Sequence, residues 1–128
     1  MDKTNKKSKK LINSFKYAIC GIVTGFKEEQ NMKIHALAVV IVIILGIALN
    51  ISKIEWIICL ISFGIVISAE LLNTAIETVV DIAMPHINEK AKIAKDVSAG
   101  AVLIQAIISA IIGINIFAPK IIAILIHQ

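Results

Sequence analysis

The sequence contains no arginine, and it has few charged and few aromatic residues. Charged residues make up 17% of the 128 residues and aromatic residues 5%, whereas hydrophobic residues make up 58%. A soluble domain is usually closer to half apolar and a quarter charged. The composition therefore indicates a membrane protein, and we expect one integral-membrane domain over residues 1–128 with no separate soluble catalytic domain.

Signals for several common nucleotide and metal sites are missing as well. The two cysteines, Cys20 and Cys59, lie in apolar surroundings without CxxC spacing, so their predicted role is packing. The sequence has no GxxxxGK[ST] phosphate loop and none of the protein-kinase motifs. Any nucleotide chemistry would therefore need a site built by membrane helices.

What the sequence does contain is four helical segments. Residues 9–30 place apolar side chains at helical spacing between lysines, which is typical of an amphipathic helix lying in the membrane interface. Residues 34–52 carry no charged side chain and are long enough to cross a hydrocarbon core of about 30 Å. Two further spans are predicted over 56–81 and 97–118. The predicted fold is all-α, with three transmembrane helices and an N-terminal interfacial helix.

The lysines predict how these helices are oriented. Eight lysines precede the first span and three lie in the loop 82–96, whereas the turn 50–55 has only Lys53. Because positively charged loops stay in the cytoplasm, the N-terminus and the loop 82–96 are expected to face inward. A basic end beside an apolar body indicates attraction to an anionic membrane surface rather than to nucleic acid.

The second predicted span has one polar face. At about 100° per residue, its polar side chains share an arc of roughly 100°. These residues are Glu70, Asn73, Thr74, Glu77 and Asp81. The opposite side of the helix is apolar, as expected for contact with lipid or with another helix.

Depth makes Glu70 the most informative of these residues. Trp56 suits a membrane interface, and the 14 residues from Trp56 to Glu70 span about 21 Å of helix. Glu70 is therefore expected within the inner leaflet, where a carboxylate is costly and usually functional. A carboxylate at that position could act as a general base on the hydroxyl of a membrane alcohol.

Other charged residues are expected at the same membrane face. Glu28 and Glu29 close the amphipathic segment, and Lys95 with Asp96 precedes the last span. Carboxylates from two elements together with phosphate oxygens suit Mg²⁺, and a lysine at a helix N-terminus suits phosphate. These residue types favour phosphoryl transfer. They leave open an ion-coupled transporter subunit, an assembly partner without enzymatic activity, and a structural membrane protein.

Two strings of residues resemble the prokaryotic diacylglycerol kinase family. Residues 70–81 read ELLNTAIETVVD, and Ala94-Lys95-Asp96 follows before the last span. The family pattern is E-x-x-N-(S/T)-A-I-E-x-V-V-D, then A-K-D. His35 and the run 99–102 look more like the undecaprenol kinase branch. The resemblance implies ATP-dependent phosphorylation of undecaprenol to undecaprenyl phosphate in the bacterial plasma membrane, with diacylglycerol as the alternative substrate.

The same resemblance implies a set of site residues. It implies a homotrimer with active sites shared between subunits, and Mg²⁺ as cofactor. Glu70 would be the catalytic base, with Asn73 and Ala99 beside it at the lipid substrate, while Glu29 and Glu77 would hold the metal. The residues implied at the ATP site are Lys10 (arginine in some family members), Tyr17, Glu29, Glu77, His86, Asn88, Lys95 and Asp96.

Overall fold

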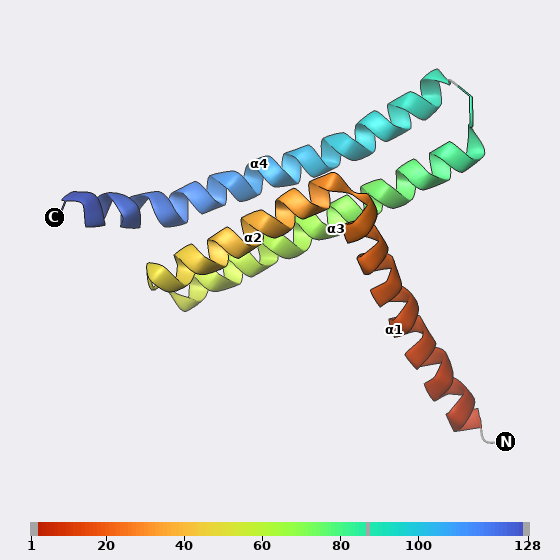
Figure 1. Cartoon of the computed structure of the whole chain (residues 1–128), viewed down its shortest axis with the longest axis horizontal. Coiled ribbons are helices and arrows are strands. Elements are labelled where there is room, and N and C mark those ends of the chain that lie inside the picture. Colours follow the sequence, from red (N-terminus) through yellow and green to blue (C-terminus); the bar gives the residue numbers. More distant parts are fainter. Residues whose placement is uncertain (1–2, 87, 127–128) are drawn as a thin grey trace.

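The computed structural model describes residues 3–86 and 88–126, and these form four helices. The helices are α1 (Lys3–Glu28), α2 (Gln30–Ala48), α3 (Lys53–Ala83) and α4 (Glu89–Ile126). Figure 1 shows α3 and α4 as a long antiparallel pair, α2 lying along α3, and α1 leaving this bundle at a steep angle. Helices α2, α3 and α4 are each long and apolar enough to cross a membrane. The predicted all-α class with three spans and an additional N-terminal helix is confirmed.

Several helix boundaries differ from the predicted ones: α1 begins at Lys3 instead of residue 9, and α4 begins at Glu89 instead of residue 97. Two further differences have clear physical reasons. Glu29 is extended (φ −94°, ψ 122°), so the chain changes direction within one residue and α2 begins at Gln30 instead of residue 34. Helix α4 was expected to end at residue 118, but it continues through Pro119 to Ile126. A proline removes only one backbone donor, and membrane helices tolerate this loss.

The turn between α2 and α3 is built from two complementary caps. Asn50 adopts a left-handed conformation (φ 47°), and the Ile51 amide donates to the Gly46 carbonyl at 3.1 Å, which closes α2 as a Schellman motif. Ser52 and Glu55 then form a capping box that opens α3, with the Ser52 amide donating to Glu55 Oε2 at 2.6 Å. The turn therefore starts α3 at Lys53, three residues before the predicted Trp56.

A small apolar cluster joins the three spans near this turn. Its buried members are Ile51, Cys59, Ile116 and Phe117. Cys59 therefore has the packing role predicted for it, whereas Cys20 is exposed on α1 and does not pack within the chain. Many large apolar side chains on all three spans also face away from the bundle and are exposed within the chain. Lipid or another subunit is the natural environment for such surfaces.

The pairing of α2 with α3 shows how far Glu70 lies from the end of the bundle where α1 joins it. His35 of α2 lies against Glu70 of α3, and these helices run in opposite directions, so the start of α2 lies near the level of Ala75. Helix α1 joins the bundle at the same end, where Gly25 is buried against Leu71. If α1 lies in the interface, Glu70 is about 8 Å below that level. On the same condition, the α3–α4 tip would extend about 12 Å beyond that level.

Candidate functional site

Glu70 lies at the wall of a cleft between the three spans. Its side chain is almost completely buried, with 1% of the residue surface exposed. The cleft has a volume of about 300 Å³ and is lined by Asn31, Ile34, His35, Glu70, Asn73, Ala99, Val102, Leu103 and Ala106. The structure thus brings together the three residues predicted at the lipid substrate, since Glu70, Asn73 and Ala99 share this cleft.

The carboxylate of Glu70 faces the ring of His35. His35 Nε2 lies 3.0 Å from Glu70 Oε1, which is an ion-pair distance. The alignment is not that of a hydrogen bond, and Oε1 is buried without a hydrogen-bond partner among the described residues. The 3.0 Å separation therefore brings the two groups close together without an aligned hydrogen bond. A buried, unsatisfied carboxylate oxygen is costly, so the Glu70 carboxylate favours a proton or a hydrogen-bond donor beside it.

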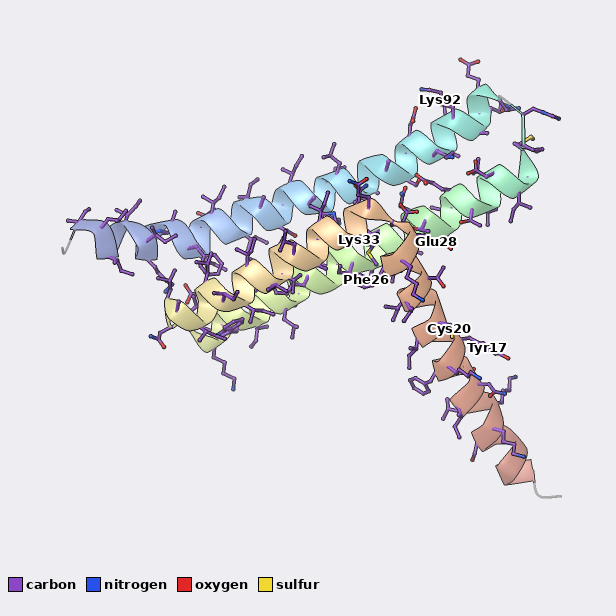
Figure 2. The ribbon with its side chains drawn as sticks, in the orientation of Figure 1. Tyr17, Cys20, Phe26, Glu28, Lys33 and Lys92 are labelled. Atoms are coloured by element: carbon purple, nitrogen blue, oxygen red, sulfur yellow. The ribbon has the colours of Figure 1, made fainter. Side chains whose placement is uncertain are left out.

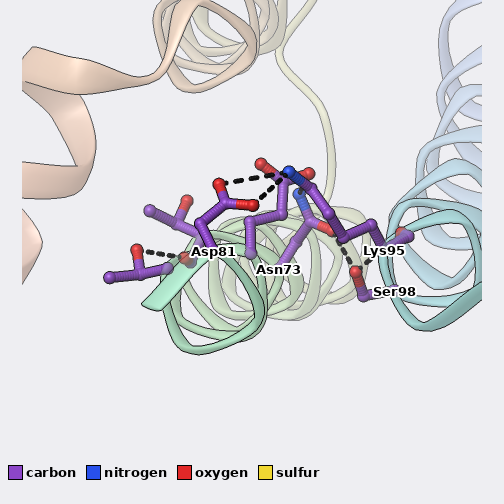
Figure 3. A network of polar contacts seen from close by, with 7 residues as sticks. Asn73, Asp81, Lys95 and Ser98 are labelled. Carbon is purple, nitrogen blue, oxygen red and sulfur yellow. Dashed lines mark hydrogen bonds and ion pairs between the residues drawn. The ribbon is translucent and has the colours of Figure 1, made fainter. Parts of the chain in front are cut away.

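A chain of hydrogen bonds leads from this cleft toward the α3–α4 tip. The Ser98 hydroxyl of α4 donates to Asn73 Oδ1 at 2.6 Å and also lies 2.9 Å from the Lys95 carbonyl of its own helix. Asn73 Nδ2 donates to Glu77 Oε1 at 3.2 Å. Ser98 and Asn73 are both 7% exposed. Figure 3 shows this network between α3 and α4, with Lys95 above it. Asn73 therefore fixes the orientation of Glu77, which lies two turns from Glu70.

Charged side chains gather at the next turn. Lys95 Nζ bonds both carboxylate oxygens of Asp81, at 3.0 and 3.2 Å. Glu77 is also close enough for its charge to act on Lys95. Lys92 Nζ pairs with Asp96 Oδ2 at 2.8 Å on the exposed side of α4. The tip thus presents carboxylates and ammonium groups that begin two turns from Glu70, at Glu77, and continue to Asp81 about three turns away.

A second cleft lies at this tip, with a volume of about 380 Å³. It contains four of the residues predicted at the ATP site: His86, Asn88, Lys95 and Asp96. Asn88 also has a structural role, because its Oδ1 accepts the Lys90 and Ala91 amides at 2.9 and 3.2 Å and so caps α4. Nucleotide binding at Asn88 would compete with this cap or use its remaining hydrogen-bonding groups.

The remaining predicted residues lie elsewhere in the chain. Tyr17 is 70% exposed on α1, and Figure 2 shows it far from Lys92 at the α3–α4 tip. Lys10 is exposed on the same helix, two turns nearer the N-terminus than Tyr17. Its backbone carbonyl accepts a hydrogen bond from the Ser14 hydroxyl. Glu29 is partly exposed at the α1–α2 junction. Within residues 3–86 and 88–126, no three acidic, histidine or cysteine side chains form a metal-binding group.

Sequence reasoning missed three participants in this site. His35 was noted only as a mark of the family branch, Ser98 was not considered, and Asp81 was not paired with Lys95. Each contact crosses between helices, so helical periodicity on one segment could not reveal it. The available signals were a histidine within an otherwise apolar span and a serine next to Ala99.

Comparisons with known proteins identify relatives of this chain. The family model described as prokaryotic diacylglycerol kinase matches residues 16–117. The chain is 44% identical over 111 residues to the undecaprenol kinase of Bacillus subtilis, covering 87% of this chain and 90% of that protein. It is 37% identical over 117 residues to a diacylglycerol kinase of Synechocystis sp., covering 91% and 67%. A diacylglycerol kinase of Haemophilus influenzae is 37% identical over 102 residues, covering 80% and 86%. The resemblance seen in the sequence is confirmed, and the chain belongs to the prokaryotic diacylglycerol kinase family.

Proposed function

We propose that this chain is a lipid kinase that transfers the γ-phosphoryl group of ATP to the hydroxyl of undecaprenol, forming undecaprenyl phosphate. The observation that carries the proposal is the buried Glu70 carboxylate in a cleft between the three spans, two turns from Glu77 and about three turns from the level of Lys95. The choice of undecaprenol as substrate rests on the 44% identity to a protein named undecaprenol kinase. A single hydroxyl on an apolar chain also suits a cleft whose α4 side is formed by Ala99, Val102, Leu103 and Ala106.

Glu70 serves as the general base in this reaction. The alcohol oxygen attacks the γ-phosphorus and its proton passes to the Glu70 carboxylate. The new O–P bond forms as the bond from the γ-phosphorus to the β–γ bridging oxygen breaks, and ADP leaves. The location supports this role, because the lipid hydroxyl and the nucleotide must meet at the boundary between apolar cleft and water.

ATP and its magnesium ion are assigned to the water-facing side of Glu70. Glu77, held by Asn73, and Glu29 at the α1–α2 junction would supply carboxylate oxygens to Mg²⁺. Two protein carboxylates suit Mg²⁺ because it takes its remaining ligands from phosphate and water, and it would neutralise phosphate charge when bound. Lys95, Asp96, His86 and Asn88 line the cleft where the nucleotide is proposed to bind.

The active enzyme is proposed to be a homotrimer in the bacterial plasma membrane, with its sites on the cytoplasmic side. In one chain Tyr17 and Lys10 lie on α1, which leaves the bundle away from the α3–α4 tip. Their participation at the nucleotide would therefore require a neighbouring subunit. Extensive exposed apolar surface on the three spans supports such packing. The orientation rests on the lysine-rich N-terminus and loop.

The proposal is tested with purified protein in lipid vesicles, radiolabelled ATP and a panel containing undecaprenol, diacylglycerol and a lipid without a hydroxyl. Magnesium-dependent label should pass to undecaprenol. Glu70→Gln should lower the rate by about 10²- to 10⁴-fold, the usual contribution of a general base. Glu55→Gln, at the far end of α3, is the matched control and should retain wild-type turnover. Normal turnover in Glu70→Gln would refute the assigned base.

Diacylglycerol is the second candidate substrate, because two relatives at 37% identity are named diacylglycerol kinases. Preferential labelling of diacylglycerol in the panel would select it. Cation movement across the vesicles with ATP left intact would instead support a non-enzymatic, cation-coupled subunit.

A further inference from the structure

Among the described residues, His35 makes the one polar contact from another helix to the buried Glu70 carboxylate. Its Nε2 lies 3.0 Å from Glu70 Oε1, across the α2–α3 interface. Glu70 Oε1 is otherwise buried without a partner among the described residues. The Glu70 carboxylate is likewise the only polar group that contacts the His35 ring in the described part of the chain. Each side chain is therefore the main polar neighbour of the other.

The composition of the cleft strengthens this relation. Apart from Glu70, His35 is the only residue lining it that can carry a charge. The α4 side contributes only apolar side chains, and Asn73 directs its amide oxygen to Ser98 and its amide nitrogen to Glu77. Asn73 is therefore engaged elsewhere. Asn31 also lines the cleft, but its side chain is exposed, and His35 is the residue whose nitrogen lies 3.0 Å from Glu70 Oε1 and is placed to donate to it.

The geometry points to His35 as a positioning residue for Glu70, an inference that rests on the proposed kinase function. A proton on Nε2 is donated to Oε1, which holds the carboxylate by one oxygen and leaves Oε2 to accept the proton of the lipid hydroxyl. Catalytic hydrogen bonds are often poorly aligned in a ligand-free protein and tighten when substrate binds. The side chain of His35 is 22% exposed, so its ring has room for that adjustment.

Two amide substitutions separate this role from simple packing. A glutamine places its amide nitrogen near the position of Nε2, whereas an asparagine is one bond shorter and reaches only the position of Nδ1. His35→Gln should therefore keep kcat within a few-fold of wild type. His35→Asn and His35→Leu should lower kcat by about 10²-fold, because a misplaced catalytic group costs roughly that much. The KM for ATP should stay unchanged in all three, since the nucleotide cleft does not include His35.

The experiment measures kcat and both KM values in vesicles, together with the thermal unfolding midpoint of each variant. Rescue by glutamine but not by asparagine, at equal midpoints, supports the inference. Wild-type kcat in His35→Leu overturns it, and so does an equal loss in all three variants that follows their thermal stability. The proposed function is judged separately, because it fails only if the wild-type protein phosphorylates no lipid alcohol.

Discussion

The hydrogen bond between Ser98 and Asn73 gives the most direct test of how α4 supports the site. Removing the hydroxyl in Ser98→Ala leaves Asn73 Oδ1 without its 2.6 Å donor, in a side chain that is 7% exposed. Leaving a buried acceptor unsatisfied costs about 1–3 kcal/mol, whereas hydrogen bonds between membrane helices average about 0.6 and reach about 1.7 kcal/mol. We therefore expect the free energy of unfolding to fall by about 1–2 kcal/mol.

A kinetic effect should accompany the loss of stability. Asn73 Nδ2 donates to Glu77 Oε1, and Ser98 holds the other end of the same amide. Once that end is free, the amide can rotate and Glu77 loses its fixed orientation. If Glu77 holds magnesium, the Mg²⁺ concentration that gives half-maximal activity should rise, while the KM for the lipid alcohol should change little.

The chain supplies a matched control for this experiment. Ser62 is also 7% exposed, but its hydroxyl donates to the Ile58 carbonyl of its own helix at 3.0 Å. That carbonyl keeps its backbone partner, so Ser62→Ala should change stability by less than about 0.5 kcal/mol. The assay is reversible unfolding in mixed detergent micelles, followed by magnesium titration of lipid phosphorylation. Equal effects of the two substitutions, or an unchanged magnesium requirement in Ser98→Ala, would refute the reasoning.

Two further predictions concern packing and nucleotide binding. A Cβ at Gly46 would lie 2.7 Å from two atoms of the rigid Trp56 ring, so Gly46→Ala should destabilise the protein by about 1–3 kcal/mol in the same unfolding assay. Gly21→Ala, where no atom lies within 4 Å, should be tolerated, and similar unfolding of both variants would contradict this account. Lys95→Met should raise the KM for ATP about tenfold or more, as expected when a charged hydrogen-bond donor is lost, with little change in thermal stability because the Asp81 pair is largely exposed. Lys53→Met at the opposite end of α3 is its control, and an unchanged KM in Lys95→Met would remove Lys95 from the nucleotide site.

Much of the fold was predictable because it depends on local physics. Long uncharged segments must form helices in a membrane, so composition alone indicated three spans. Helical periodicity likewise placed Glu70, Asn73 and Glu77 on one face of α3, and the structure puts Glu70 and Asn73 in the same cleft. The helix ends were less predictable, because the extended Glu29 and the continuous helix at Pro119 depend on backbone geometry that residue types favour only weakly.

Contacts between helices were decided only by the tertiary structure. The helix class, the apolar spans and the acidic face of α3 could be predicted, because each follows from residues close together along the chain. The sequence by itself could not determine that His35 faces Glu70, that Ser98 holds Asn73, or that Lys95 pairs with Asp81 across 14 residues. These contacts depend on the rotation and register of one helix against another, and packing of the whole bundle sets both.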